Sequence, residues 1–153
     1  MMEEKLVALN TRDVKGIRKK IDEHWGCSFK GEYFWFRSTS GKLYVISKDA
    51  AKVDFSKLRI DSVGMYFARE GDDGLRLSIE GSQIIGSIAA KNMLEIDEYE
   101  IKEWLHGEEL SPIDMDLTGL SGYVIVKHKN DFFGCGKVTQ SSILNFVPKV
   151  RRV

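Results

Sequence analysis

Three short segments near the end of the chain have the β-branched and aromatic character of strands: residues 123–128, 132–138 and 143–147. The segments that connect them, residues 129–131 and 139–142, are short and polar. Strands joined by such turns pair as antiparallel neighbours. Because two helical segments come before this cluster, the sequence predicts an α+β fold that ends in a small antiparallel sheet or barrel.

These two helices have recognisable start and stop signals. Ser78 is placed to cap the first, while Asp97 and Glu100 have the spacing of a capping box at the start of the second. Gly107 is placed to end the second helix in the left-handed conformation. The predicted core faces carry Ile84, Ile85, Ile88 and Ala89 in the first helix, and Ile101, Trp104 and Leu105 in the second.

The first half of the chain contains another amphipathic helix, predicted over residues 11–24. Thr11 is its expected N-cap, and Gly26 its expected stop. Val14, Ile17 and Ile21 form its apolar stripe. The opposite face carries five basic residues (Arg12, Lys15, Arg18, Lys19 and Lys20), which we interpret as a solvated face.

Strands follow this helix. Residues 33–37 and 42–47 are aromatic and β-branched runs separated by a Ser-Thr-Ser-Gly stretch, which predicts a hairpin. Residues 48–55 read as a short helix or turn, and residues 60–68 as a further strand. Asp72-Asp73-Gly74 is typical of a tight turn, followed by a short strand.

Charge is balanced overall but unevenly distributed. The chain has 23 basic and 23 acidic residues, so net charge argues neither for nor against nucleic acid as a partner. Residues 95–116 contain nine acidic residues and one basic residue, whereas residues 127–153 contain six basic residues and one acidic residue. This asymmetry favours a partner for the basic segment, although two solvated blocks would look the same.

Signals for catalysis, cofactors and membranes are weak. His24, His106 and His128 have no metal-ligand spacing, and no phosphate-binding glycine loop occurs, so we expect no cofactor and no enzyme activity. No apolar run approaches the ~20 residues of a membrane span. Cys27 and Cys135 are expected to be packing residues in a cytoplasmic protein, although Lys137 would favour a thiolate if Cys135 were reactive.

Two glycines in the predicted strand over residues 132–138 suggest that another backbone lies close to this strand. With a period of two, Gly134 and Gly136 project to the same face, which lacks side chains there. Either a ligand backbone lies against that face, or the glycines relieve crowding at a barrel corner. The residue pattern leaves both interpretations open.

Three motifs in order resemble the PUA-type RNA-binding region attached to RNA cytosine-5 methyltransferases of bacteria and archaea. The first is GMYFAREGDDGLRLSIEGSQIIG, the second IKEWLHGEEL, and the third GYVIVKHKNDFFGCGKVTQSSILNFVPKVRRV. The resemblance covers about residues 58–153. Neither cysteine follows a proline, as the nucleophile of those enzymes does, and no glycine-rich S-adenosylmethionine loop is present.

The resemblance implies a small α/β pre-PUA domain over residues 1–73 and a PUA-like pseudo-barrel over residues 74–153. It also implies a cytoplasmic protein that binds ribosomal or transfer RNA, as an accessory factor in RNA modification or ribosome biogenesis. The expected RNA-contacting residues are Phe133, Gly134, Gly136, Lys137, Lys149, Arg151 and Arg152.

The alternative is a protein-interaction module that docks a methyltransferase or a ribosomal protein through its acidic helix. A small hydrolase or transferase remains a third interpretation, without a supporting motif.

Overall fold

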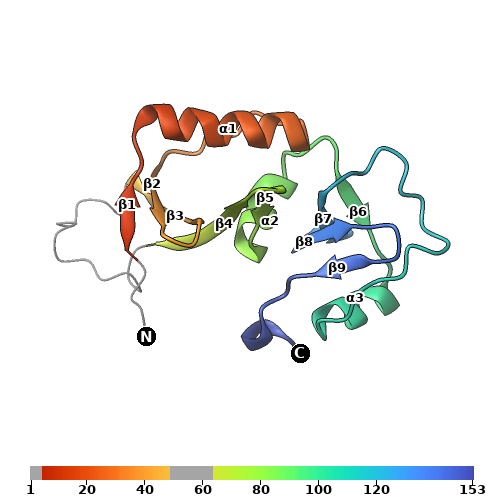
Figure 1. The fold of residues 1–153 in the computed structure, drawn as a ribbon. Helices are drawn as coiled ribbons and strands as arrows, with labels where there is room; N and C mark the ends of the chain where they lie inside the picture. The colour runs from red at the N-terminus through yellow and green to blue at the C-terminus, as the bar shows by residue number, and fades with distance from the viewer. Residues whose placement is uncertain (1–4, 49–63) are drawn as a thin grey trace.

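The computed structural model describes residues 5–48 and 64–153, which form two β-sheets and three α-helices (Figure 1). The first sheet is antiparallel, with its strands in sequence order: β1 (Leu6–Ala8), β2 (Tyr33–Ser38), β3 (Lys42–Ser47), β4 (Met65–Gly71) and β5 (Gly74–Leu77). The second sheet consists of β6 (Met93–Glu95), β7 (Tyr123–His128), β8 (Asp131–Val138) and β9 (Ile143–Asn145). The helices are α1 (Thr11–Trp25), α2 (Ile79–Gly86) and α3 (Glu98–Leu105), with a 3₁₀ turn, η4, at Lys149–Arg151. This is the predicted α+β class.

Helix α1 covers one face of the first sheet (Figure 1). It is amphipathic, and it buries Ile17, Ile21 and Trp25 against the sheet. Its N-cap is Asn10, one residue before the predicted Thr11, because the Asn10 side chain accepts the Asp13 backbone N–H at 2.9 Å. Gly26 ends the helix with a φ of +66°, as predicted.

A register shift between β3 and β4 decides which residues face the core. Leu43 pairs with Ala68, but the next residue, Tyr44, pairs with Tyr66, so Phe67 is the extra residue of a bulge. Phe67 and Ala68 are consequently both buried. The directly opposed partners Tyr44 and Tyr66 have their ring centroids 5.6 Å apart, and neither belongs to the core cluster that α1 packs on.

The two sheets share a hydrophobic core. The larger apolar cluster combines residues of α1 and the first sheet with Tyr123, Ile125 and Cys135 of the second. A second cluster lies under α3, where the fully buried Trp104 donates its indole N–H to the Phe133 carbonyl at 2.9 Å. Truncation of a buried tryptophan costs about 3–5 kcal/mol, so Trp104 alone fixes α3 firmly on the second sheet.

Several sequence predictions need correction. Strand β9 ends at Asn145 rather than Val147, and Ile88, predicted to face the core, is 46% exposed just beyond the end of α2. Strands β1 and β6 were not predicted, because each has only three residues and β6 pairs in parallel with β7. The helix or turn predicted over residues 48–55 lies almost entirely outside the described residues, as does the first part of the strand predicted over 60–68.

The predicted helix caps at Ser78 and Asp97 are confirmed, as is the turn at Asp72-Asp73. The predicted domain boundary after Asp73 stays a prediction, although β5, which follows it, is paired with β4 in the first sheet. Among the described residues, no helix has the length and apolar content needed to cross a membrane.

Candidate nucleic-acid interface

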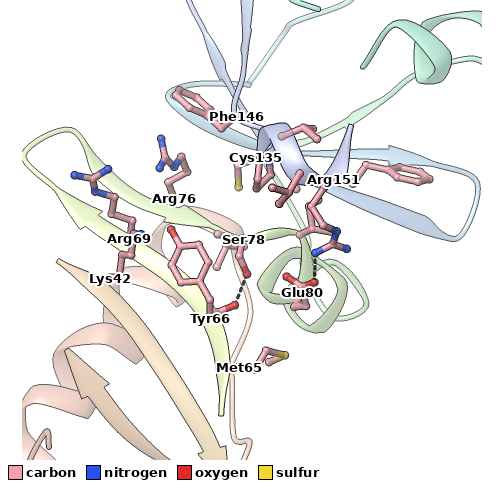
Figure 2. A pocket seen from close by; sticks show the side chains of 17 residues that line it. Lys42, Met65, Tyr66, Arg69, Arg76, Ser78, Glu80, Cys135, Phe146 and Arg151 are labelled. Carbon is pink, nitrogen blue, oxygen red and sulfur yellow. Dashed lines mark hydrogen bonds and ion pairs between the residues drawn. The ribbon is translucent and has the colours of Figure 1, made fainter. Parts of the chain in front are cut away.

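A cleft of about 660 Å³ lies between the two sheets, on the side of the first sheet that α1 does not cover. One wall comes from β3, β4 and β5, and the other from the start of α2, the middle of β8 and the segment after β9 (Figure 2). The charged and aromatic side chains that line it are Lys42, Tyr66, Arg69, Arg76, Glu80, Phe133, Phe146 and Arg151.

Three of these cations form a row across adjacent strands. Lys42 of β3 is directly opposite Arg69 of β4, and Arg69 is in turn directly opposite Arg76 of β5. The two-residue turn at Asp72-Asp73 sets the second pairing, because it places Gly71 opposite Gly74 and fixes the register back to Arg69. We refer to Lys42, Arg69 and Arg76 as the cation row.

The cation row has no carboxylate partner in the described parts of the chain, where the ion pairs all involve other cations. Like charges on directly opposed strand residues destabilise a sheet. Glu80, the one acidic residue of the described lining, forms an ion pair at 2.5 Å with Arg151, which faces the row across the cleft. Four cations against one carboxylate give this lining a formal charge of +3, so the cleft is suited to an anion.

Two of the three aromatic side chains of the cleft, Tyr66 and Phe146, lie against members of the cation row. The Arg76 guanidinium lies 4.3 Å from the centroid of the Phe146 ring, and the Lys42 ammonium lies 5.8 Å from that of Tyr66. Phe146 is half-buried and its ring also contacts the edge of Tyr123, at 5.8 Å between centroids. Flat apolar surfaces and positive charge therefore alternate along the same cleft.

Three of the residues predicted to contact RNA line this cleft: Phe133, Gly134 and Arg151. Gly134 is buried with a φ of +85°, and an added Cβ would lie 3.4 Å from Ile79 of α2. Gly136 is also buried, and an added Cβ there would lie 2.7 Å from Ile143 and 2.9 Å from Trp104. The space beside both glycines, which a ligand backbone was expected to enter, is thus filled by the protein's own side chains.

The other four predicted residues, Gly136 included, do not line the cleft. Lys137 forms an ion pair with Asp73 of the turn before β5, at 2.8 Å. Lys149 is exposed at the start of η4. Arg152 donates its Nε–H to the Val147 carbonyl at 3.2 Å and packs over Gly107, which fixes the chain end beside α3.

Two titratable groups near the cleft have raised pKa values. Cys135 lies at its base, and burial raises the pKa of its thiol to about 12, which keeps it protonated at neutral pH. Burial, followed by the hydrogen bond to Asp73, raises the pKa of Tyr123 to about 12 as well. Within residues 5–48 and 64–153, His, Cys, Asp and Glu side chains form no group of three or more that could bind a metal ion.

Comparison with known proteins agrees with this architecture. Residues 91–153 match the family described as the methyltransferase RsmF PUA domain. The ribosomal RNA small subunit methyltransferase F of Aeromonas hydrophila is 24% identical over 141 residues, and that of Vibrio cholerae is 26% identical over 115 residues. These alignments cover 92% and 75% of this chain but only 28% and 23% of those enzymes, so the chain spans about a quarter of their length.

A solved structure of a conserved PUA domain protein from Thermoplasma acidophilum superimposes with a TM-score of 0.63 at 14% identity. The superposition covers 97% of this chain and 98% of that one, so it includes the first sheet as well as the second. The resemblance predicted from the sequence is therefore confirmed: the chain has the fold of a PUA domain protein, and its C-terminal part is similar to the PUA domain of ribosomal RNA small subunit methyltransferase F.

Proposed function

We propose that this protein binds structured RNA, of the ribosomal or transfer class, and acts in the cytoplasm as an accessory factor in RNA modification or ribosome biogenesis. The observation that carries the proposal is the cation row, which places three positive charges side by side in one wall of the cleft, with no ion-paired carboxylate among the described residues. The similarity to a segment of ribosomal RNA methyltransferases supports RNA as the polyanion. RNA phosphates would neutralise the repulsion between the three cations of the row, which the sheet itself leaves uncompensated.

The C-terminal residues extend this surface. Arg151 lies in the cleft, and Lys149 precedes it by two residues on η4. Glu80 holds Arg151 at the cleft in the absence of RNA, and a phosphate would compete with that carboxylate for the guanidinium. Lys149 and Arg151 are therefore proposed as phosphate contacts, whereas Gly134 lines the cleft and Gly136 is packed against Ile143 and Trp104.

The salt dependence of RNA binding tests this proposal. Fluorescence anisotropy with labelled transfer RNA and ribosomal RNA fragments gives the affinity at several salt concentrations. The slope of log affinity against log salt falls in magnitude by roughly one unit for each phosphate-binding cation that a substitution removes. We expect a decrease of about two units in the double variant Arg69→Gln/Arg76→Gln.

The matched control is Lys19→Gln, which removes an exposed cation from the solvent face of α1, outside the cleft. It should leave both affinity and slope unchanged. Failure of every RNA to bind at low salt, or equal slopes for the wild type and the double variant, would show that the cleft does not bind RNA.

A second candidate function rests on the acidic segment. A depression of about 530 Å³ beside the start of α3 is lined by Glu95, Asp97, Glu100, Asp114 and Asp116. The neighbouring Ile113 is 76% exposed, so a basic and partly apolar protein segment, from a methyltransferase or a ribosomal protein, would fit this surface. This candidate predicts a protein partner that remains bound after nuclease treatment and no longer binds the variant Asp114→Lys.

A further inference from the structure

The cleft has one charged wall and one largely apolar wall, and recognition of a duplex backbone does not require both. Its first wall carries the cation row, and its second wall is largely apolar, with Ile79, Phe133, Phe146 and Val147. Double-stranded RNA is recognised mainly through its phosphates and 2′-hydroxyl groups, whereas unpaired bases stack on aromatic rings and guanidinium planes. A ligand that uses both walls carries negative charge and a flat apolar face on the same unit.

The size of the cleft fits such a unit. Its volume of about 660 Å³ lies within the ~300–1,000 Å³ of pockets that enclose small ligands. An A-form duplex is too wide to enter it. A single nucleotide displaced from its helix has the required size, charge and flat surface.

The contacts between aromatic rings and cations indicate how a nucleotide would be oriented in the cleft. Arg76 lies on the ring of Phe146, so a base that stacks on this pair places its own phosphates near Arg69. Lys42 and Tyr66 lie farther along the same face of the sheet, next to Arg69. Figure 2 shows Arg69, Arg76 and Tyr66 on one side of the cleft and Phe146 above them.

Two further groups of the lining, Cys135 and Ser78, are already buried or hydrogen-bonded. Cys135 forms part of the floor as a buried thiol that stays protonated, and Ser78 is already engaged: its hydroxyl donates to the Tyr66 carbonyl at 2.6 Å and accepts the Gly81 N–H at 2.9 Å. Neither group offers a nucleophile to the ligand.

We propose that the cleft between the two sheets holds one unpaired nucleotide of a structured RNA, with its base stacked on Arg76 and Phe146 and its phosphates beside Arg69 and Lys42. This inference rests on the proposed RNA-binding function and adds the element that is recognised. It predicts that RNA with a bulged or looped-out nucleotide binds more tightly than a fully paired duplex.

Two conservative variants separate stacking from charge. Arg76→Lys keeps the positive charge but removes the planar guanidinium, and Phe146→Leu keeps an apolar side chain but removes the ring. Arg12→Lys and Tyr99→Leu are the matched controls, because Arg12 is exposed on α1 and Tyr99 is 73% exposed on α3, both outside the cleft. Thermal unfolding of all four variants shows whether any loss of binding results from a loss of folded protein.

The probes are an RNA hairpin with a single-nucleotide bulge and a blunt duplex of the same stem sequence, both fluorescein-labelled. Removal of base stacking should weaken binding of the bulged hairpin at least about fivefold in Arg76→Lys and Phe146→Leu. Binding of the duplex should change less than about twofold, and the controls should match the wild type on both RNAs.

Three other outcomes overturn the inference, in two distinguishable ways. Equal binding of both RNAs by the wild type, or equal weakening on both RNAs in the variants, would remove the nucleotide pocket but leave RNA binding in place. No binding of either RNA at low salt would overturn the inference together with the proposed function.

Discussion

Repulsion between the like charges of the cation row should lower the free energy of unfolding of the RNA-free protein. Arg69 has a like charge directly opposite on each side, Lys42 on β3 and Arg76 on β5. A directly opposed pair of strand residues contributes about 0.2–1 kcal/mol, with an unfavourable sign for like charges. Arg69→Thr removes both repulsive pairs and introduces a residue that favours strands. We therefore expect the free energy of unfolding to rise by about 1 kcal/mol at low salt.

Urea unfolding at low salt and at about 1 M salt measures this effect. The Debye length falls to about 3 Å at 1 M, so the part of the gain that comes from charge should shrink there, while the part from strand propensity remains. In a chain of this size a gain of about 1 kcal/mol corresponds to a rise of about 2–4 °C in Tm. Arg69→Lys, which keeps the charge, is the control and should show no gain.

The same variant should bind RNA more weakly, since it removes a proposed phosphate contact. Higher stability with lower affinity is the expected signature of charges retained for binding. If Arg69→Thr destabilises the protein, or if its gain is equal at both salt concentrations, the row is not repulsive in the free protein. The claim that it awaits an anion would then be wrong.

Three further predictions concern the second sheet and the turn before β5. Gly136→Ala should lower the free energy of unfolding by about 1–3 kcal/mol in urea titrations, because its Cβ would overlap Ile143 and Trp104; unchanged stability would contradict this packing. The pKa of Asp73 is lowered, first by its hydrogen bond from Lys137, so its contribution is complete above about pH 4 and disappears as pH falls below that. Asp73→Asn should therefore reduce stability at about pH 7 by a few tenths of a kcal/mol for this exposed pair and flatten the profile below about pH 4; parallel profiles would contradict it. Cys135 should resist a thiol reagent in the native protein at mildly alkaline pH and react on unfolding, as its buried, protonated thiol requires; rapid native labelling, with Cys27→Ser used to isolate the signal, would contradict it.

Local sequence signals predicted most of the elements but not the cleft. The helix caps at Ser78 and Asp97, the stop at Gly26 and the turn at Asp72-Asp73 depend on residues close in the chain, and the structure confirms them. The three-residue strands β1 and β6 were missed because they form only by pairing with distant segments of the chain. Asn10 takes the capping role predicted for Thr11, because Asn is the stronger N-cap and Asp13, three residues later, completes a capping box with it.

The binding residues expected from the sequence were those near the C-terminus, where basic residues are dense. The cation row was missed because Lys42, Arg69 and Arg76 are separated in the sequence and meet only through strand register. One signal was present: a two-residue turn at positions 72 and 73 places Arg69 opposite Arg76. The bulge at Phe67, which aligns Tyr66 with Tyr44, has no comparable sequence signal.

An NMR titration of the isotope-labelled protein with a bulged RNA hairpin tests the central claim most directly. If the cleft binds RNA, the largest shifts should occur at Arg69, Arg76 and Phe146, including the guanidinium and ring resonances, and should saturate together. Shifts confined to the acidic surface around α3, or scattered shifts that vanish at physiological salt, would contradict the claim that the cleft between the two sheets is the RNA-binding site.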